Sequence, residues 1–175
     1  MRILIIGGAG FIGSHLCESY AQQHNVTSLD NYISGKKENH VDNVNYIDMD
    51  VKNILSLDQK YDLVFHLGEY SRVENSLKKI DFVLDNNMNP ILNILKFVKE
   101  SNAKLVYAGS STKYADDGRN KYQSPYSFSK WQNSELVKFY CELSNIPYAI
   151  TYFYNVYGGR ENYDGEFATV IAKFL

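Results

Sequence analysis

The sequence is short of several features that mark common classes of protein. It has two cysteines, Cys17 and Cys141, with no CxxC spacing, so we expect structural thiols in a reducing compartment and no metal site. Its 18 Lys and Arg residues are balanced by 20 Asp and Glu residues. This balance gives no electrostatic reason to expect nucleic acid or an anionic membrane as a partner.

Long apolar runs, internal repeats and low-complexity linkers are also missing. No apolar run reaches the roughly 18 residues that a membrane span requires, and the apolar run at the N-terminus is too short for a signal peptide. We therefore expect a cytoplasmic protein without membrane association. The 175 residues fit one domain that buries about 70% of its unfolded surface.

Six apolar, strand-like runs alternate with helical patterns along the chain. The runs are RILIIG, NVTSLD, VNYIDMD, YDLVFHLG, AKLVYAGSS and IPYAITYFYN, and the clearest helical patterns are Phe11–Gln23, Ile80 to Ser101 and Pro125–Ser144. This alternation predicts right-handed βαβ units and an α/β fold with a doubly wound parallel sheet of the Rossmann type. Such sheets bind ligands beyond the carboxyl ends of their strands, so the residues after each run are candidate site residues.

The first run leads through a glycine-rich turn, GGAGFIG, into a helical pattern. Gly7 would allow the tight turn, and Gly10 would let backbone amides approach a pyrophosphate. Gly13 would let the helix pack close to the strand, with its N-terminal dipole aimed at the phosphates. No role is expected for Gly8. The alternative is a turn between strand and helix that is rich in glycine without binding a nucleotide.

Acidic residues follow the second and third runs. Asp30 lies about 20 residues beyond the glycine turn, where a carboxylate can accept from both adenosine ribose hydroxyls and would repel a 2′-phosphate. This position favours NAD over NADP, although Asp30 and Asn31 could also be a simple turn pair. Asp50 could accept from the adenine amino group while Val51 packs on the ring; the alternative is an ordinary solvated aspartate.

The fourth and fifth runs end near His66 and Ser110. His66 is interpreted as a satisfied buried histidine, with catalysis as the less favoured alternative. Gly68, two residues later, would let the backbone approach a cofactor. Ser110 begins a polar loop in which hydroxyl groups are ordinary.

A helix start is indicated in SPYSFSK, with Ser124 as N-cap and Pro125 at the first helical position. Tyr126 and Lys130 are one turn apart on the same helix face. A nearby ammonium favours the phenolate form, so Tyr126 is a candidate general base. The same spacing over residues 32–36 falls in a glycine-containing loop and is discarded.

Together these motifs resemble the extended short-chain dehydrogenase/reductase family, and in particular its NAD-dependent sugar-nucleotide epimerases and dehydratases, typified by UDP-galactose 4-epimerase. The likeness runs over essentially the whole chain through GGAGFIGSHL, LDNYISG, DMDV, VFHLG, DNNMNP, AGSSTKY, SPYSFSK and NVYGGRE. It implies NAD as cofactor and a nucleotide sugar as substrate. It also implies a homodimer formed through a four-helix contact, with candidate helices within 80–101 and 125–144.

The resemblance also implies roles for single residues. Ser110, Tyr126 and Lys130 match the catalytic triad, and Asn155 matches an asparagine at the substrate phosphates. The residues that match cofactor contacts are Gly7, Gly10, Phe11, Ile12, Gly13, Asp30, Asn31, Asp50, Val51, Leu67, Gly68, Asn87, Tyr126 and Lys130. The implied reaction is epimerisation at C4 of a UDP-sugar through a transient 4-keto sugar. A reductase or decarboxylase of the same family and a non-catalytic NAD-binding module are the alternatives.

Several positions depart from the family pattern. Ser111 and Thr112 stand where dehydratases carry Asp-Glu, which argues against dehydration, and Gly68-Glu69 replaces the commoner Ala-Ala. Further departures are Ala115, Tyr152 and Gly159. Family members continue into a smaller C-terminal substrate domain, most of which we expect this sequence to lack. We therefore expect residues 1–155 to form the NAD-binding domain with the triad, and 156–175 a truncated start of the substrate-binding region, with a helix over 165–175.

Overall fold

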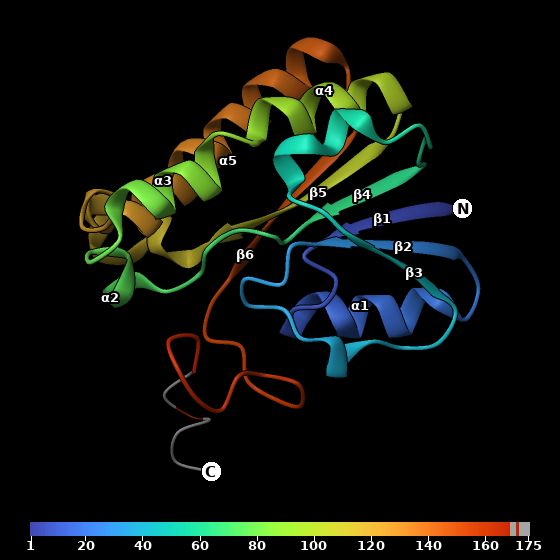
Figure 1. Cartoon of the computed structure of the whole chain (residues 1–175). Helices are drawn as coiled ribbons and strands as arrows, with labels where there is room; N and C mark the ends of the chain where they lie inside the picture. The colour runs from blue at the N-terminus through green and yellow to red at the C-terminus, as the bar shows by residue number, and fades with distance from the viewer. Residues whose placement is uncertain (169–170, 172–175) are drawn as a thin grey trace.

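The computed structural model describes residues 1–168 and 171 and places six parallel strands in one sheet (Figure 1). The order across the sheet is β3-β2-β1-β4-β5-β6, and every neighbouring pair is parallel. The strands are β1 (Arg2–Ile6), β2 (Asn25–Asp30), β3 (Val44–Asp48), β4 (Leu63–His66), β5 (Lys104–Ser110) and β6 (Tyr148–Phe153). Each predicted run contains one strand, and the strand order reverses between β1 and β4. The predicted doubly wound Rossmann sheet is therefore confirmed.

Helices cover both faces of this sheet. Helix α1 (Phe11–Ala21) lies on one face, and α3 (Ile80–Met88), α4 (Ile91–Ser101) and α5 (Pro125–Ser144) lie on the other (Figure 1). The helical pattern predicted from Ile80 to Ser101 is two helices, because Pro90 has no N–H to continue the ladder and becomes the N-cap of α4. The start and end predicted for α5 are confirmed.

Short helical turns connect the larger elements at the edge where the strands end. They are α2 (Val73–Ser76), η1 (Lys37–Asn39), η2 (Val51–Ser56), η3 (Ser111–Lys113) and η4 (Ala115–Tyr122). The third strand ends at Asp48, two residues before the predicted point, because Asp50 caps η2 by accepting from the amide of Lys52 at 2.9 Å. Of these turns, η3 begins directly after β5 and η2 begins three residues after the end of β3, whereas η1 and α2 each begin seven residues after the end of a strand.

Two hydrophobic cores result from the alternation of side chains along the buried strands. Ile3 and Ile5 of β1 pack toward α1 with Cys17, whereas Leu4 and Ile6 pack toward α4 and α5. Both cysteines are free and buried, and burial raises the pKa of Cys17 to about 12 and that of Cys141 to about 11. Both thiols are therefore inert packing groups at neutral pH.

The chain after β6 crosses back over the α1 side of the sheet (Figure 1). Of the helix predicted over 165–175, residues 165–168 form a bend and a turn and Ile171 is helical, while the other positions lie outside the described residues. Among the helices that the structure describes, none has the length and apolar character needed to cross a membrane.

Candidate active site

The glycine turn joins β1 to α1 through very close backbone contacts. Gly7 has φ +85, and a Cβ added there would lie 2.7 Å from the amide nitrogen of Gly68; a Cβ on Gly13 would lie 2.1 Å from the Gly7 carbonyl oxygen. The predicted steric roles of Gly7 in the turn and Gly13 in helix packing are confirmed. The expectation that Gly8 has no role is wrong, because a Cβ there would lie 2.4 Å from Ser28 Oγ on β2. Gly10 is different, since its added Cβ would meet only the Gly7 oxygen, at 3.3 Å.

Asp30 connects the end of β2 to this turn. Its carboxylate accepts from the amides of Ala9 and Tyr32, each at 2.9 Å. Burial raises the pKa of Asp30, although these two amides oppose the shift. Each oxygen accepts one amide hydrogen and keeps a lone pair for a further donor. The carboxylate is thus held rigidly beside the glycine turn with room to accept from a ligand hydroxyl.

A small hollow opens at the carboxyl ends of β1, β2 and β4. The residues that line it are Ile6, Gly7, Leu29, Asp30, Asn31, Met49, Val51 and Gly68. Five of these were predicted as cofactor contacts. The other three, Ile6, Leu29 and Met49, were not predicted, because apolar side chains at the ends of strands carry no motif. Apolar walls with one fixed carboxylate suit an adenosine group, so the residues fit the adenosine half of NAD.

The other predicted cofactor residues lie around this hollow. Phe11 and Ile12 form the first turn of α1, half-buried, and Leu67 follows β4 with its amide bonded to the Ile6 carbonyl at 2.9 Å. Asp50 is half-buried, and one of its carboxylate oxygens accepts the hydrogen bond that caps η2. Their contacts with the cofactor stay predictions.

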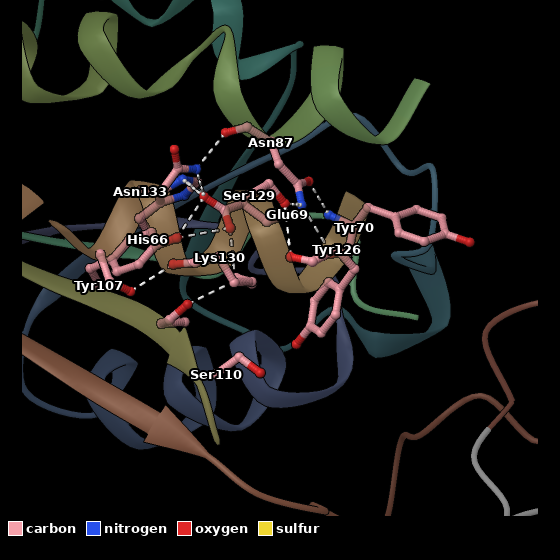
Figure 2. Close-up of polar contacts among 12 residues, drawn as sticks. His66, Glu69, Tyr70, Asn87, Tyr107, Ser110, Tyr126, Ser129, Lys130 and Asn133 are labelled. Atoms are coloured by element: carbon pink, nitrogen blue, oxygen red, sulfur yellow. Dashed lines mark hydrogen bonds and ion pairs between the residues drawn. The ribbon is translucent and has the colours of Figure 1, made fainter. Parts of the chain in front are cut away.

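The predicted triad residues lie at the carboxyl end of β5 and at the start of α5. Ser110 is the last residue of β5 and is buried, and its Oγ accepts from Thr112 Oγ1 at 3.0 Å. Ser124 caps α5 by accepting from the Ser127 amide at 3.0 Å, which sets Tyr126 and Lys130 in the first two turns. Figure 2 shows the Tyr126 hydroxyl directed away from the cluster of buried polar side chains around Glu69, to the side on which Ser110 lies.

Lys130 is buried and reaches the end of β5. Its Nζ donates to the Ala108 carbonyl at 2.7 Å and lies 2.8 Å from Glu69 Oε2. The ammonium also lies over the ring of Tyr107, 5.4 Å from its centroid. A buried ammonium needs such partners, because an unpaired charge in this environment would be strongly destabilising.

Glu69 lies at the centre of this cluster with its side chain fully buried. Tyr107 donates its hydroxyl to the carboxylate at 3.0 Å, and Asn133 donates its amide to Oε1 at 3.0 Å (Figure 2). Burial, the largest single cause, would raise the pKa of Glu69, but the Lys130 ammonium and the His66 imidazole together outweigh burial and hold this pKa below its ordinary value. The carboxylate in turn raises the pKa of Tyr107, in which burial is the larger cause. Glu69 is therefore ionised and paired at neutral pH.

His66 is buried as predicted, but its hydrogen bonding is not satisfied, so that part of the interpretation is wrong. Its Nε2 lies 3.2 Å from Glu69 Oε1 without the direction of a hydrogen bond, and Nδ1 has no hydrogen-bond partner among the described residues. The imidazole ring instead packs against Tyr107, with 5.6 Å between ring centroids. His66 lies beside Glu69 because it is the last residue of β4, three residues before Glu69 in the chain.

Asn87 joins three segments beneath the cluster. Its Oδ1 accepts from the Tyr70 amide at 2.8 Å, and its Nδ2 donates to Ser129 Oγ at 2.9 Å. The carbonyl of Asn87 accepts from Asn133 at 2.8 Å. Asn87 therefore fixes the segment after β4 against α5, and its predicted contact with the cofactor stays a prediction. Asn155, the predicted substrate residue, is exposed in the segment after β6.

Sequence reasoning missed the central part played by Glu69, Tyr107 and Asn133. The replacement of Ala-Ala by Gly68-Glu69 was noted as a departure from the family pattern, and this was the available signal. Tyr107 and Asn133 carried none, because a tyrosine in a strand and an asparagine in a helix are ordinary. The cluster depends on β4 and β5 being neighbours, with His66 paired to Tyr107.

The fold and these clusters define a dinucleotide-binding α/β domain with a Ser, Tyr and Lys group beside the ligand edge of its sheet. Residues 3–175 match the family described as NAD dependent epimerase/dehydratase. The chain belongs to this family, and NAD is the family's cofactor, as predicted from the sequence.

Relatives with assigned names cover the whole chain. It is 32% identical to a UDP-N-acetyl-alpha-D-glucosaminuronate decarboxylase of Bacillus cytotoxicus, over 99% of this chain and 60% of that protein. It is 33% identical to a putative UDP-glucose 4-epimerase of Methanocaldococcus jannaschii, over 99% and 61%. The crystal structure of Thermotoga maritima UDP-glucose 4-epimerase with UDP-glucose matches at a TM-score of 0.89 and 26% identity, over 99% of this chain and 62% of that one. The chain thus spans about three fifths of each of these proteins.

Proposed function

We propose that the chain is the cofactor-binding and catalytic part of an NAD-dependent enzyme that epimerises a UDP-sugar at C4 through a transient 4-keto sugar. The observation that carries this proposal is the placement of Ser110, Tyr126 and Lys130. They lie at the edge of the sheet that also carries the glycine turn and the hollow beside Asp30. The named relatives, which include UDP-glucose 4-epimerases, support it.

The residues would divide the work in a definite way. Gly7, Gly13 and Asp30 would hold the cofactor, which supplies a hydride acceptor and donor when bound. Tyr126 would take the proton from the sugar 4-hydroxyl and later return it, as a general base and acid. Ser110 would donate a hydrogen bond to the same sugar oxygen, where negative charge develops.

Lys130 would complete the site by the positive charge of its ammonium and by the one N–H of that ammonium that is not already directed at a protein acceptor. An ammonium has three N–H donors, and within the described residues two of them are directed at the Ala108 carbonyl and at Glu69. The third would serve the nicotinamide ribose, and the positive charge would favour the phenolate form of Tyr126.

Epimerisation is tested by incubating the chain with NAD and UDP-glucose and following UDP-galactose by chromatography or proton NMR. Tyr126→Phe should abolish turnover while leaving the NAD-induced rise in Tm nearly unchanged, because only the hydroxyl is removed. Turnover by the Tyr126→Phe variant at the wild-type rate would sink the assignment of the base. NADP is the control ligand and should raise Tm much less.

A decarboxylase is the second candidate, since a relative that covers 99% of the chain at 32% identity carries that name. It is tested by incubating the chain with NAD and a UDP-linked uronic acid and measuring released CO2. CO2 release without interconversion of UDP-glucose and UDP-galactose would favour this candidate over the epimerase.

We also propose a homodimer through the helices predicted for it. Large apolar side chains are exposed on all three: Phe82 on α3, Leu92 on α4, and Phe139 and Leu143 on α5, the last two 63% and 70% exposed. Exposed apolar side chains gathered on neighbouring helices are typical of a protein interface.

A further inference from the structure

The buried carboxylate of Glu69 is the most unusual feature beside the proposed catalytic residues. Its side chain is inaccessible to solvent, and it receives donors from both layers of the fold: Tyr107 on β5, and Lys130 and Asn133 on α5. A buried carboxylate is retained only when charge and hydrogen bonds compensate for its lost hydration. Here a single carboxylate satisfies three buried groups at once.

We propose that Glu69 is a positioning residue that holds the Lys130 ammonium at the carboxyl end of β5 and balances its charge beside Tyr126. The proposal rests on the proposed function, because it assigns to Glu69 control over the lysine and tyrosine of that site. Glu69 itself lies behind Lys130, and the hydroxyl of Tyr126 is directed away from it (Figure 2).

The geometry fixes where the ammonium can lie. The Ala108 carbonyl and Glu69 Oε2 contact Nζ at 2.7 and 2.8 Å. Each contact uses one N–H, so the two together orient the remaining one. Without the carboxylate, Nζ keeps only the Ala108 carbonyl as a strong acceptor among these, and the directions of its other two N–H bonds are no longer fixed.

The charges around Glu69 come from every element packed against it. Lys130 on α5 is the cation in direct contact, His66 on β4 adds an imidazole at 3.2 Å, and Tyr107 on β5 adds a neutral phenol. Glu69 and Lys130 therefore form a neutral pair when both are ionised. Loss of the carboxylate leaves one positive charge close to Tyr126, and a positive charge makes each neighbouring group give up its proton at lower pH.

The decisive comparison is Glu69→Gln, Glu69→Asp and wild type. Gln has the same shape and can still accept from Tyr107, but it lacks the charge. Asp keeps the charge on a side chain that is one methylene shorter. The matched control is Glu135→Gln, the same change at a glutamate on α5, the helix that carries Lys130; its lysine partner, Lys113, lies on a half-exposed surface.

The first readout needs neither cofactor nor substrate. Amine labelling followed by mass spectrometry gives the pH at which Lys130 becomes reactive, with the exposed Lys138 of α5 as internal standard. In Glu69→Gln this pH should fall by about one unit or more, the size expected for one close charge in a buried site. Glu135→Gln should leave it unchanged, and Glu69→Asp should give a smaller fall. The Asp variant keeps the test decisive if the Gln variant does not fold.

The second readout separates positioning from simple structural support. The acid limb of the pH profile of turnover at saturating NAD should move to lower pH by about one unit in Glu69→Gln and stay in place in Glu135→Gln. A purely structural ion pair would lower Tm without moving this limb. Wild-type behaviour of folded Glu69→Gln in both readouts overturns the proposal.

The two readouts also distinguish this proposal from the proposed function. Should wild type show no turnover with UDP-sugars, the proposed function fails, and the labelling of Lys130 decides the positioning role alone. Unchanged labelling in Glu69→Gln then overturns the positioning role as well. If wild type turns over UDP-sugars and the acid limb of the pH profile does not move in Glu69→Gln, the proposed function holds and only the role of Glu69 is overturned.

Discussion

Gly13→Ala tests how closely α1 must pack on the glycine turn. The added Cβ would lie 2.1 Å from the Gly7 oxygen and 2.8 Å from both the Gly7 carbon and the Gly8 Cα, whereas carbon and oxygen atoms normally approach to roughly 3.3 Å. The helix must therefore move by roughly 1 Å against a backbone that cannot rotate away. Overpacking of this kind costs about 3 kcal/mol, the upper end of the usual range. For a chain of this size that corresponds to a fall in Tm of about 6–12 °C.

Gly10→Ala is the matched control from the same turn. Its Cβ would meet only the Gly7 oxygen, at 3.3 Å, and its φ of −77 and ψ of 175 suit alanine. We expect its unfolding free energy to change by less than about 1 kcal/mol, although NAD binding should weaken because the methyl group occupies the space left for the pyrophosphate. Thermal and urea unfolding, each with and without NAD, measure both effects. Equal stability of the two variants would refute the close-packing argument.

Three further predictions concern other parts of the molecule. Asp30→Asn should lower the unfolding free energy by about 1–3 kcal/mol, measured in urea, because an amide NH2 would face one of two backbone donors. An unchanged urea midpoint would contradict it. The folded-state pKa of Glu69 is about 2 against an ordinary value of 4.5, so its contribution to stability is present above pH 4.5 and is lost as the pH falls towards 2. The unfolding free energy should therefore fall less between pH 7 and 3 in Glu69→Gln than in wild type, and parallel curves would count against it. Phe139→Asp combined with Leu143→Asp should shift the chain from dimer to monomer in light scattering while the far-UV circular dichroism stays that of the folded chain, since both side chains are exposed on the single chain; a monomeric wild type would exclude the dimer.

The sheet could be predicted because each strand has a recognisable pattern within its own short stretch of sequence. Apolar runs of strand length, separated by helical patterns, leave few topologies once crossovers are right-handed. The start of α5 was equally local, since Ser124 and Pro125 supply a cap and a fixed φ at adjacent positions. The break within 80–101 was missed because the apolar period continues on both sides of Pro90 and only the missing N–H interrupts it.

Gly8 shows where a spacing argument stops. Its neighbours in the motif could be assigned from the G-x-x-G-x-x-G pattern, but Gly8 is restricted by Ser28, on the strand paired with β1. That contact depends on Ile5 pairing with Ser28, which no pattern in the turn encodes. A glycine beside a motif can thus be as restricted as a glycine within it.

Glu69 is likewise a residue whose role depends on contacts with distant segments, here through the charge of its carboxylate. Read along the chain, a glutamate after a strand-ending glycine is most simply a solvated acid. In the fold, the segment after β4 turns beneath α5, and the pairing of His66 with Tyr107 brings β5 beside it. Lys130 and Asn133, one helical turn apart, then close over the carboxylate from above. A lysine predicted from its spacing to Tyr126 is thereby held in place by a residue 61 positions earlier in the chain. Its charge at the site is set as much by that long-range pairing as by the motif in which it was found.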